Sequence, residues 1–153
     1  MISKDEFEFE VTDVQKKLGD LFVHYGKVKK GSIKLEQDVE MKINIEKRND
    51  TRAYHSATHL LHESLRRVLR PHVTQKGSLV EPERLRFDFS HMKPISDDEM
   101  VKIESHVNDM ISKQSDVTTR IMTPKEAVDN GALALFGEKY GDEVRVLSMG
   151  DEG

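Results

Sequence analysis

The stretch HSATHLLHESLRRVL, residues 55–69, decides the fold of the second half of the chain. On a helix each residue advances by about 100°, so His55, His59 and His62 fall within one narrow arc. Apolar residues fall on the other side and predict a face turned toward a core: Leu60, Leu61, Leu65 and Val68. The predicted helix runs from about residue 51 to residue 69 and stops before Pro71.

The histidine spacing indicates a possible metal site. Imidazoles at positions i and i+4 of a helix can bind one ion, as in the zinc-binding HxxxH of metalloproteases. A metalloprotease would carry Glu directly after the first histidine, and Ser56 stands there instead. The pattern leaves two interpretations, a metal site or a solvated polar face, with His62 as a conceivable third ligand.

Composition limits the class of protein. A chain of 153 residues suits one domain or two small ones, and it contains no cysteine. Disulfides and Cys-ligated zinc are therefore excluded within this chain, and a reducing compartment is expected. No apolar run approaches the roughly 18 residues of a membrane helix, and the N-terminus has no signal-peptide pattern. We therefore expect a cytoplasmic location.

Charge is unevenly distributed along the chain. The formal net charge is −4, but residues 51–92 carry seven basic and four acidic side chains. An anionic partner near the histidine helix is one explanation, and an ordinary mixed surface is the other. The basic residues of this region are Arg52, Arg66, Arg67, Arg70, Lys76, Arg84 and Arg86.

The first 50 residues predict a small β-barrel or β-meander. Apolar and charged residues alternate in FEFEV (7–11) and VEMKINIE (39–46), and LFVHYGKV (21–28) is typical of a strand entering a turn. The polar run at residues 47–50 predicts the boundary with a second domain over residues 51–153.

The second part predicts an α+β domain with helices packed on an antiparallel sheet. RLRFDF (84–89), VTTRIM (117–122) and EVRVLSM (143–149) are predicted strands. Ser96 and Glu99 form a capping-box pattern before a helix, and Pro124 begins a short helix that Gly131 ends. The first of these helices carries a predicted core stripe: Met100, Ile103, Val107, Met110 and Ile111.

Several long motifs resemble alanyl-tRNA synthetases. RAYHSATHLLHESLRRVLRPHVTQKGSLVEPERLRFDFSH and the later GALALFGEKYGDEVRVLSMG are similar to the editing domain of that family. VTDVQKKLGDLFVHYGKV resembles the β-barrel before it, so the resemblance covers nearly all of residues 7–150. It implies hydrolysis of tRNA(Ala) mischarged with serine or glycine, with the tRNA acceptor end as partner. We expect neither a DNA nor a membrane partner, and oligomeric state is left open.

The resemblance also implies site residues. His55 and His59 match two zinc ligands of the family, whose other two ligands lie in a CGGTH-like motif that is missing from this sequence. We therefore expect a fragment with half of a zinc site. Gln75 matches a glutamine that lines the editing pocket, and its alternative is a turn residue. Thr58 matches a pocket-shaping position, and its alternative is helix packing.

Candidates for phosphate contacts with the tRNA acceptor end are Arg52, Arg66, Arg67, Lys76 and Arg86, and the alternative for each is a solvated surface charge. Phe89 is expected in the core rather than the pocket. ATP and magnesium belong to the aminoacylation domain of the family, which nothing in this sequence resembles. Two alternatives remain: a free-standing trans-editing deacylase, and a non-catalytic tRNA-binding module.

Overall fold

The computed structural model describes residues 1–133 and 140–150, and the chain divides into two compact units, Met1–Arg52 and Ala53–Gly153. This division lies close to the predicted boundary at residue 50. Helices and antiparallel strands both occur, which confirms the α+β class. The ALFGEK part of the last family motif, residues 134–139, lies outside the described residues.

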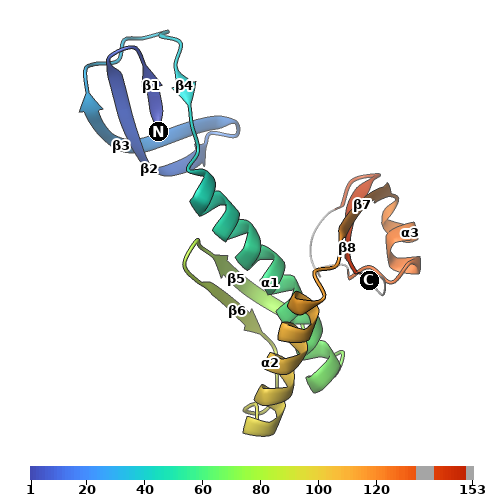
Figure 1. Ribbon diagram of the computed structural model, residues 1–153. Coiled ribbons are helices and arrows are strands. Elements are labelled where there is room, and N and C mark those ends of the chain that lie inside the picture. Colours follow the sequence, from blue (N-terminus) through green and yellow to red (C-terminus); the bar gives the residue numbers. More distant parts are fainter. Residues whose placement is uncertain (134–139, 151–153) are drawn as a thin grey trace. The chain divides into compact units, whose positions relative to one another are not determined.

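Four strands form the sheet of the first unit in the order β3-β2-β1-β4. They are β1 (Ile2–Lys4), β2 (Phe7–Lys17), β3 (Leu21–Lys30) and β4 (Glu40–Met41). Figure 1 shows β2 and β3 as long neighbouring strands that bend together. Their pairing shifts register at two points, Glu8/Phe9 and Val11/Asp13. Such irregularities increase the local bend of a strand. Closure of this sheet into a barrel stays a prediction.

Gly26 of β3 allows the bend to be tight. A side chain at this position would overlap the carbonyl oxygen of Glu10 on β2 and lie 2.9 Å from the Phe9 ring. Only glycine permits so close an approach of two backbones.

The predicted strand over residues 39–46 is largely wrong. Only Glu40–Met41 is a strand, and α1 (Ile45–Leu69) begins six residues before the predicted helix start. Asn44 explains the early start of α1, because its Oδ1 accepts a hydrogen bond from the Lys47 backbone N–H at 3.0 Å. An asparagine in this position caps the first turn of a helix. The alternating residues Ile43 and Ile45 are mostly exposed and face no core.

In the second unit, β5 (Gln75–Val80) and β6 (Leu85–Phe89) form one antiparallel hairpin, and β7 (Val117–Met122) and β8 (Val144–Met149) form another. Within the described residues this unit also contains α2 (Asp97–Ser112) and α3 (Pro124–Asp129). The predicted strands at β6, β7 and β8 are confirmed. The strand β5 was not predicted, because Lys76-Gly77 within it is typical of a turn.

The core of the second unit joins α1, α2 and β6. Its buried members are Leu65, Leu69, Val73 and Ile103, and Phe87 and Phe89 of β6 pack against them. The predicted core role of Phe89 is therefore confirmed. The predicted stripe on α2 is only partly correct, because Ile103 is buried whereas Met100 and Ile111 are about half exposed. Val107 and Met110 are partly buried, so burial is complete only at Ile103, which joins the cluster of Leu65, Leu69 and Val73.

Both predicted helix starts after residue 90 are confirmed. The Ser96 hydroxyl accepts from the Glu99 backbone N–H, and Glu99 accepts in return from the Ser96 backbone N–H at 2.9 Å. Thr123 and Glu126 form the same reciprocal pair before α3, with Pro124 at its first position. Among the described residues, no helix is both long and apolar enough to cross a membrane.

Candidate functional site

His55 and His59 lie on successive turns of α1 and face each other. Their Nε2 atoms are 3.3 Å apart, and the ring centroids are 4.9 Å apart at an interplanar angle of 49°. Both residues are exposed. Desolvation lowers the pKa of His59, and the neighbouring charges of His55 and His62 lower it further. These effects favour the neutral imidazole of His59, which is the form that either accepts a hydrogen bond or binds a metal.

His62 does not share this solvated face. It is 8% exposed, and its ring lies 5.2 Å from the ring of Phe87 on β6. The expectation that all three histidines lie opposite the apolar face is wrong for His62. One helical turn separates it from buried Thr58 on one side and buried Leu65 on the other, so it lies at the edge of the core face.

No third ligand joins the histidine pair within the described ranges 1–133 and 140–150. No group of three or more His, Cys, Asp or Glu side chains in these ranges is placed to hold a metal ion. The chain thus brings together the two predicted metal-binding histidines and separates them from the conceivable third.

Thr58 is buried on the core side of α1. Its Oγ1 donates to the backbone carbonyl of Tyr54 at 2.9 Å, four residues earlier. This arrangement uses the hydroxyl proton within the helix and leaves the methyl group for packing. Thr58 can therefore shape a neighbouring surface but has no free proton to donate.

Gln75 begins β5 and is partly buried. Its Nε2 donates to the hydroxyl of Ser78 at 3.1 Å, and the β5–β6 pairing shifts register between Gln75 and Gly77. Bulges re-aim side chains next to functional sites in many proteins. The alternative of a turn residue does not hold, because the pairing of Gln75 with Phe89 makes it part of the hairpin, and the pocket role stays a prediction.

Three of the predicted tRNA-contacting residues already have partners within the chain. Arg66 donates to the carbonyl of Pro71 at 2.9 Å, Arg67 pairs with Glu63 at 2.7 Å, and Arg86 pairs with Asp88 at 3.1 Å. Arg52 and Lys76 are exposed, and neither forms an ion pair with any described residue.

Sequence reasoning missed a pair formed by His72 and His91. The Nε2 of His72 lies 3.0 Å from the Nδ1 of His91, and the rings are nearly parallel. The two residues are 19 positions apart, and no local spacing rule joins them. The pairing of β5 with β6 brings them together, since each lies just outside that hairpin.

Comparison with characterised proteins identifies the relatives of this chain. No protein-family model matches it. It is 61% identical over 150 residues to the alanine–tRNA ligase of Parvibaculum lavamentivorans. It is 56% and 55% identical, over the same length, to those of Mesorhizobium japonicum and Rhodopseudomonas palustris. These matches cover 98% of this chain and 17% of each relative. The resemblance seen in the sequence motifs is confirmed, and the chain is homologous over nearly its whole length to a segment of alanine–tRNA ligase.

Proposed function

We propose that the chain is the editing part of an alanine–tRNA ligase, which in the intact enzyme hydrolyses the ester of tRNA(Ala) that carries serine or glycine, and that this chain alone is weak or inactive. The observation that supports this function best is the convergence of the His55 and His59 Nε2 atoms, 3.3 Å apart, in a segment homologous to that enzyme. Such an activity is needed because a pocket for a small side chain cannot reject near-isosteres by binding alone.

The histidine pair fits two positions of a zinc site. Zinc–nitrogen bonds of about 2.0–2.1 Å in a tetrahedral site put two ligand nitrogens about 3.3–3.4 Å apart. The observed separation of 3.3 Å between the Nε2 atoms of His55 and His59 equals this distance between two ligand nitrogens. It is also a hydrogen-bond distance, so a zinc ion and a shared proton would compete for the same two lone pairs. Two imidazoles fill half of a tetrahedral site, and further ligands must complete it.

Zinc bound here would polarise a water molecule or orient the aminoacyl group. The chain's own residues would act on the substrate in other ways. Gln75 has an amide that can both donate to and accept from a serine hydroxyl, and Ser78 holds that amide in place. Thr58 would shape the pocket by its bulk, since its hydroxyl already donates to the backbone carbonyl of Tyr54.

The acceptor end of tRNA would be held through its phosphates. Lys76 and Arg52 are the strongest candidates among the predicted residues because each is exposed and free of ion pairs with the described residues. Arg66, Arg67 and Arg86 would first have to leave partners on the same chain. We expect the substitution of Lys76 to weaken tRNA binding and that of Arg66 mainly to lower stability.

Deacylation tests this function directly. Ser-tRNA(Ala) and Ala-tRNA(Ala) would be incubated with this chain and with the full-length P. lavamentivorans enzyme, each with added zinc or with a chelator. We expect the long enzyme to release serine and to spare alanine. Loss of serine release after the residue equivalent to His59 in the long enzyme is replaced by alanine, with retained alanine charging, would support the assignment.

The alternatives give different results. A free-standing trans-editing deacylase predicts that the 153-residue chain alone releases serine at a rate close to that of the long enzyme. A non-catalytic tRNA-binding module predicts that it retains tRNA without deacylation, and that the same replacement in the long enzyme has no effect on editing. Intact serine release in the long enzyme with that replacement would overturn the proposed role of the histidine pair.

A further inference from the structure

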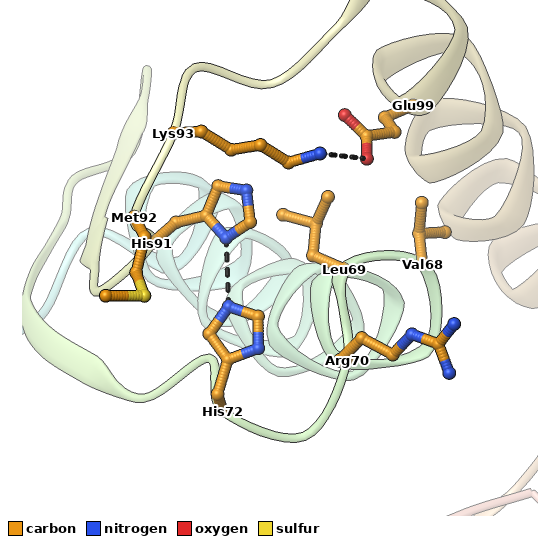
Figure 2. Close-up of a pocket in the computed structure, with 8 residues that line it drawn as sticks. All are labelled: Val68, Leu69, Arg70, His72, His91, Met92, Lys93 and Glu99. Carbon is orange, nitrogen blue, oxygen red and sulfur yellow. Dashed lines mark hydrogen bonds and ion pairs between the residues drawn. The ribbon is translucent and has the colours of Figure 1, made fainter.

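A hollow of about 470 Å³ lies at the C-terminal end of α1, lined from α1, the loop that follows it, the loop between β6 and α2, and α2 itself. Figure 2 shows the His72–His91 pair on one wall and the Lys93–Glu99 ion pair above it. The residues proposed for editing do not line it. We propose that this hollow is a phosphate-binding site for an RNA backbone.

Positive and hydrogen-bonding groups dominate the polar lining. Arg70 and Lys93 are cations, and the imidazoles of His72 and His91 supply further ring nitrogens. Arginine, lysine and imidazole N–H groups are the usual protein partners of phosphate oxygens.

The one carboxylate in the lining, that of Glu99, already has hydrogen-bond partners. Glu99 accepts hydrogen bonds from the backbone and hydroxyl of Ser96, which hold the pKa of its carboxyl below the usual value. Its other oxygen lies 3.8 Å from the Lys93 ammonium, a loose contact that an entering phosphate can replace. The carboxylate therefore serves the helix cap and stays ionised, and the two cations of the lining, Arg70 and Lys93, outnumber it.

His91 has one nitrogen without a partner. Its Nδ1 contacts His72, and its Nε2 is buried without a hydrogen bond. A buried ring nitrogen that is left unpaired costs free energy, so such groups usually have a bound water or ligand. In Figure 2 this nitrogen lies on the side of the ring that faces Lys93. With the His91 Nδ1 accepting from the Nε2–H of His72, the His91 Nε2 would carry a proton, and a phosphate oxygen could accept from it and from the Lys93 ammonium.

Arg70 adds an independent indication. Its backbone has φ +97°, in a region that L-residues rarely adopt, at the position after a helix where glycine is common. Strain of this kind persists at sites where the side chain serves a function. The guanidinium makes no hydrogen bond or ion pair with any described residue. In Figure 2 it extends from the end of α1 away from the histidine pair, where it can reach the next phosphate of a nucleic-acid chain.

The choice of RNA as the source of the phosphate rests on the proposed function, whereas the anion site itself does not. An RNA minihelix with the acceptor stem of tRNA(Ala) would be titrated with the chain, and binding followed by fluorescence anisotropy at several salt concentrations. In parallel, inorganic phosphate would be added while the ring signals of His72 and His91 are recorded by NMR, with chloride at equal ionic strength as the reference.

Arg70→Gly is the decisive variant because it should stabilise the fold while it removes the cation. We expect a higher melting temperature and about tenfold weaker RNA binding. The slope of log affinity against log salt concentration should become smaller in magnitude by about one, since about one fewer ion is released. Arg84→Gly is the matched control, since Arg84 is exposed, pairs with Glu81 and lies outside the hollow. It should leave RNA binding within twofold of the original chain.

The outcomes separate this site from the editing function. Equal RNA affinity in the original chain and Arg70→Gly, or an equal loss in Arg84→Gly, would overturn the proposal. A phosphate-induced shift of the histidine signals without any effect of Arg70→Gly on RNA affinity would reject RNA as the source. If Arg70→Gly does not fold, Lys93→Gln decides the question by the same criteria. Arg70-dependent RNA binding without serine release would keep the phosphate site and remove the editing assignment.

Discussion

The hydroxyl of Ser64 donates a hydrogen bond of 2.9 Å to the backbone carbonyl of Ile103 and so joins α1 to α2. Ser64 is completely buried in the core of the second unit. A short polar side chain at the contact lets two helices approach closely, and its one donor must be satisfied there. The pair therefore fixes the spacing and the register of α2 against α1, the helix that carries His55 and His59.

Ser64→Ala should lower the free energy of unfolding by about 1 kcal/mol, because one buried hydrogen bond is lost without a large cavity. Ser64→Val should lower it further through overpacking, by about 1–3 kcal/mol. Urea unfolding monitored by circular dichroism measures both. Ser105→Ala is the control, since Ser105 is exposed on α2, the helix of the acceptor Ile103, and its effect should stay within about 0.5 kcal/mol.

His62 should make the second unit less stable in acid. Burial is the largest cause of its lowered pKa, so the unfolded chain binds the proton more readily than the folded one. Above the ordinary pKa of 6.5, His62 is neutral in both states and its contribution to the free energy of unfolding is fully present. That contribution is lost as the pH falls from 6.5 toward the lowered pKa of the folded state.

Urea unfolding at pH 7.5 and pH 5.5 tests this statement. The original chain should lose more stability between the two than His62→Gln, in which the titrating group is absent. His62→Gln also removes the contact with Phe87, so its stability at pH 7.5 should be lower. An identical loss in both proteins on acidification would show that His62 is not the group responsible.

Gly26→Ala should disrupt the first unit. The new methyl group would overlap the Glu10 carbonyl, so the β2–β3 pairing must shift or open. We expect a loss of about 2–4 kcal/mol in the free energy of unfolding. Gly19→Ala is a matched control with open space around the new methyl group and φ +86°, so it meets backbone strain alone, of about 1–2 kcal/mol. Equal losses in the two variants would contradict the close approach at Gly26.

Zinc binding should depend on both members of the histidine pair. His55→Ala or His59→Ala leaves a single imidazole, and the affinity for zinc should fall more than tenfold in each variant. Competition with a chromophoric chelator measures that affinity without any need for activity. His24→Ala in β3 should leave it unchanged, because His24 lies in the other unit. Unaltered affinity in His59→Ala would show that zinc binds elsewhere on the chain.

The α2 cap and the end of α1 follow from neighbouring residues alone. Ser96 with Glu99 predicts the start of α2, and Pro71 predicts the end of α1 at Leu69. Alternating residues in the same way predict β6 and the first five residues of β2, 7–11. These features need only interactions between residues a few positions apart, so a sequence pattern determines them.

Family motifs in the sequence also determined the likeness to alanine–tRNA ligase and the pairing of His55 with His59. A spacing of four residues brings two side chains together on any helix, whatever surrounds it. The convergence of their Nε2 atoms to 3.3 Å is therefore local in origin.

Tertiary structure decided the rest. The strand β5 forms because its partner β6 overrides the turn tendency of Lys76-Gly77. His62 is buried because Phe87, distant in sequence, packs on it, and the His72–His91 pair exists only because the hairpin joins its ends. Each of these features is a contact between distant residues, whose free energy depends on burial that no short stretch of sequence contains.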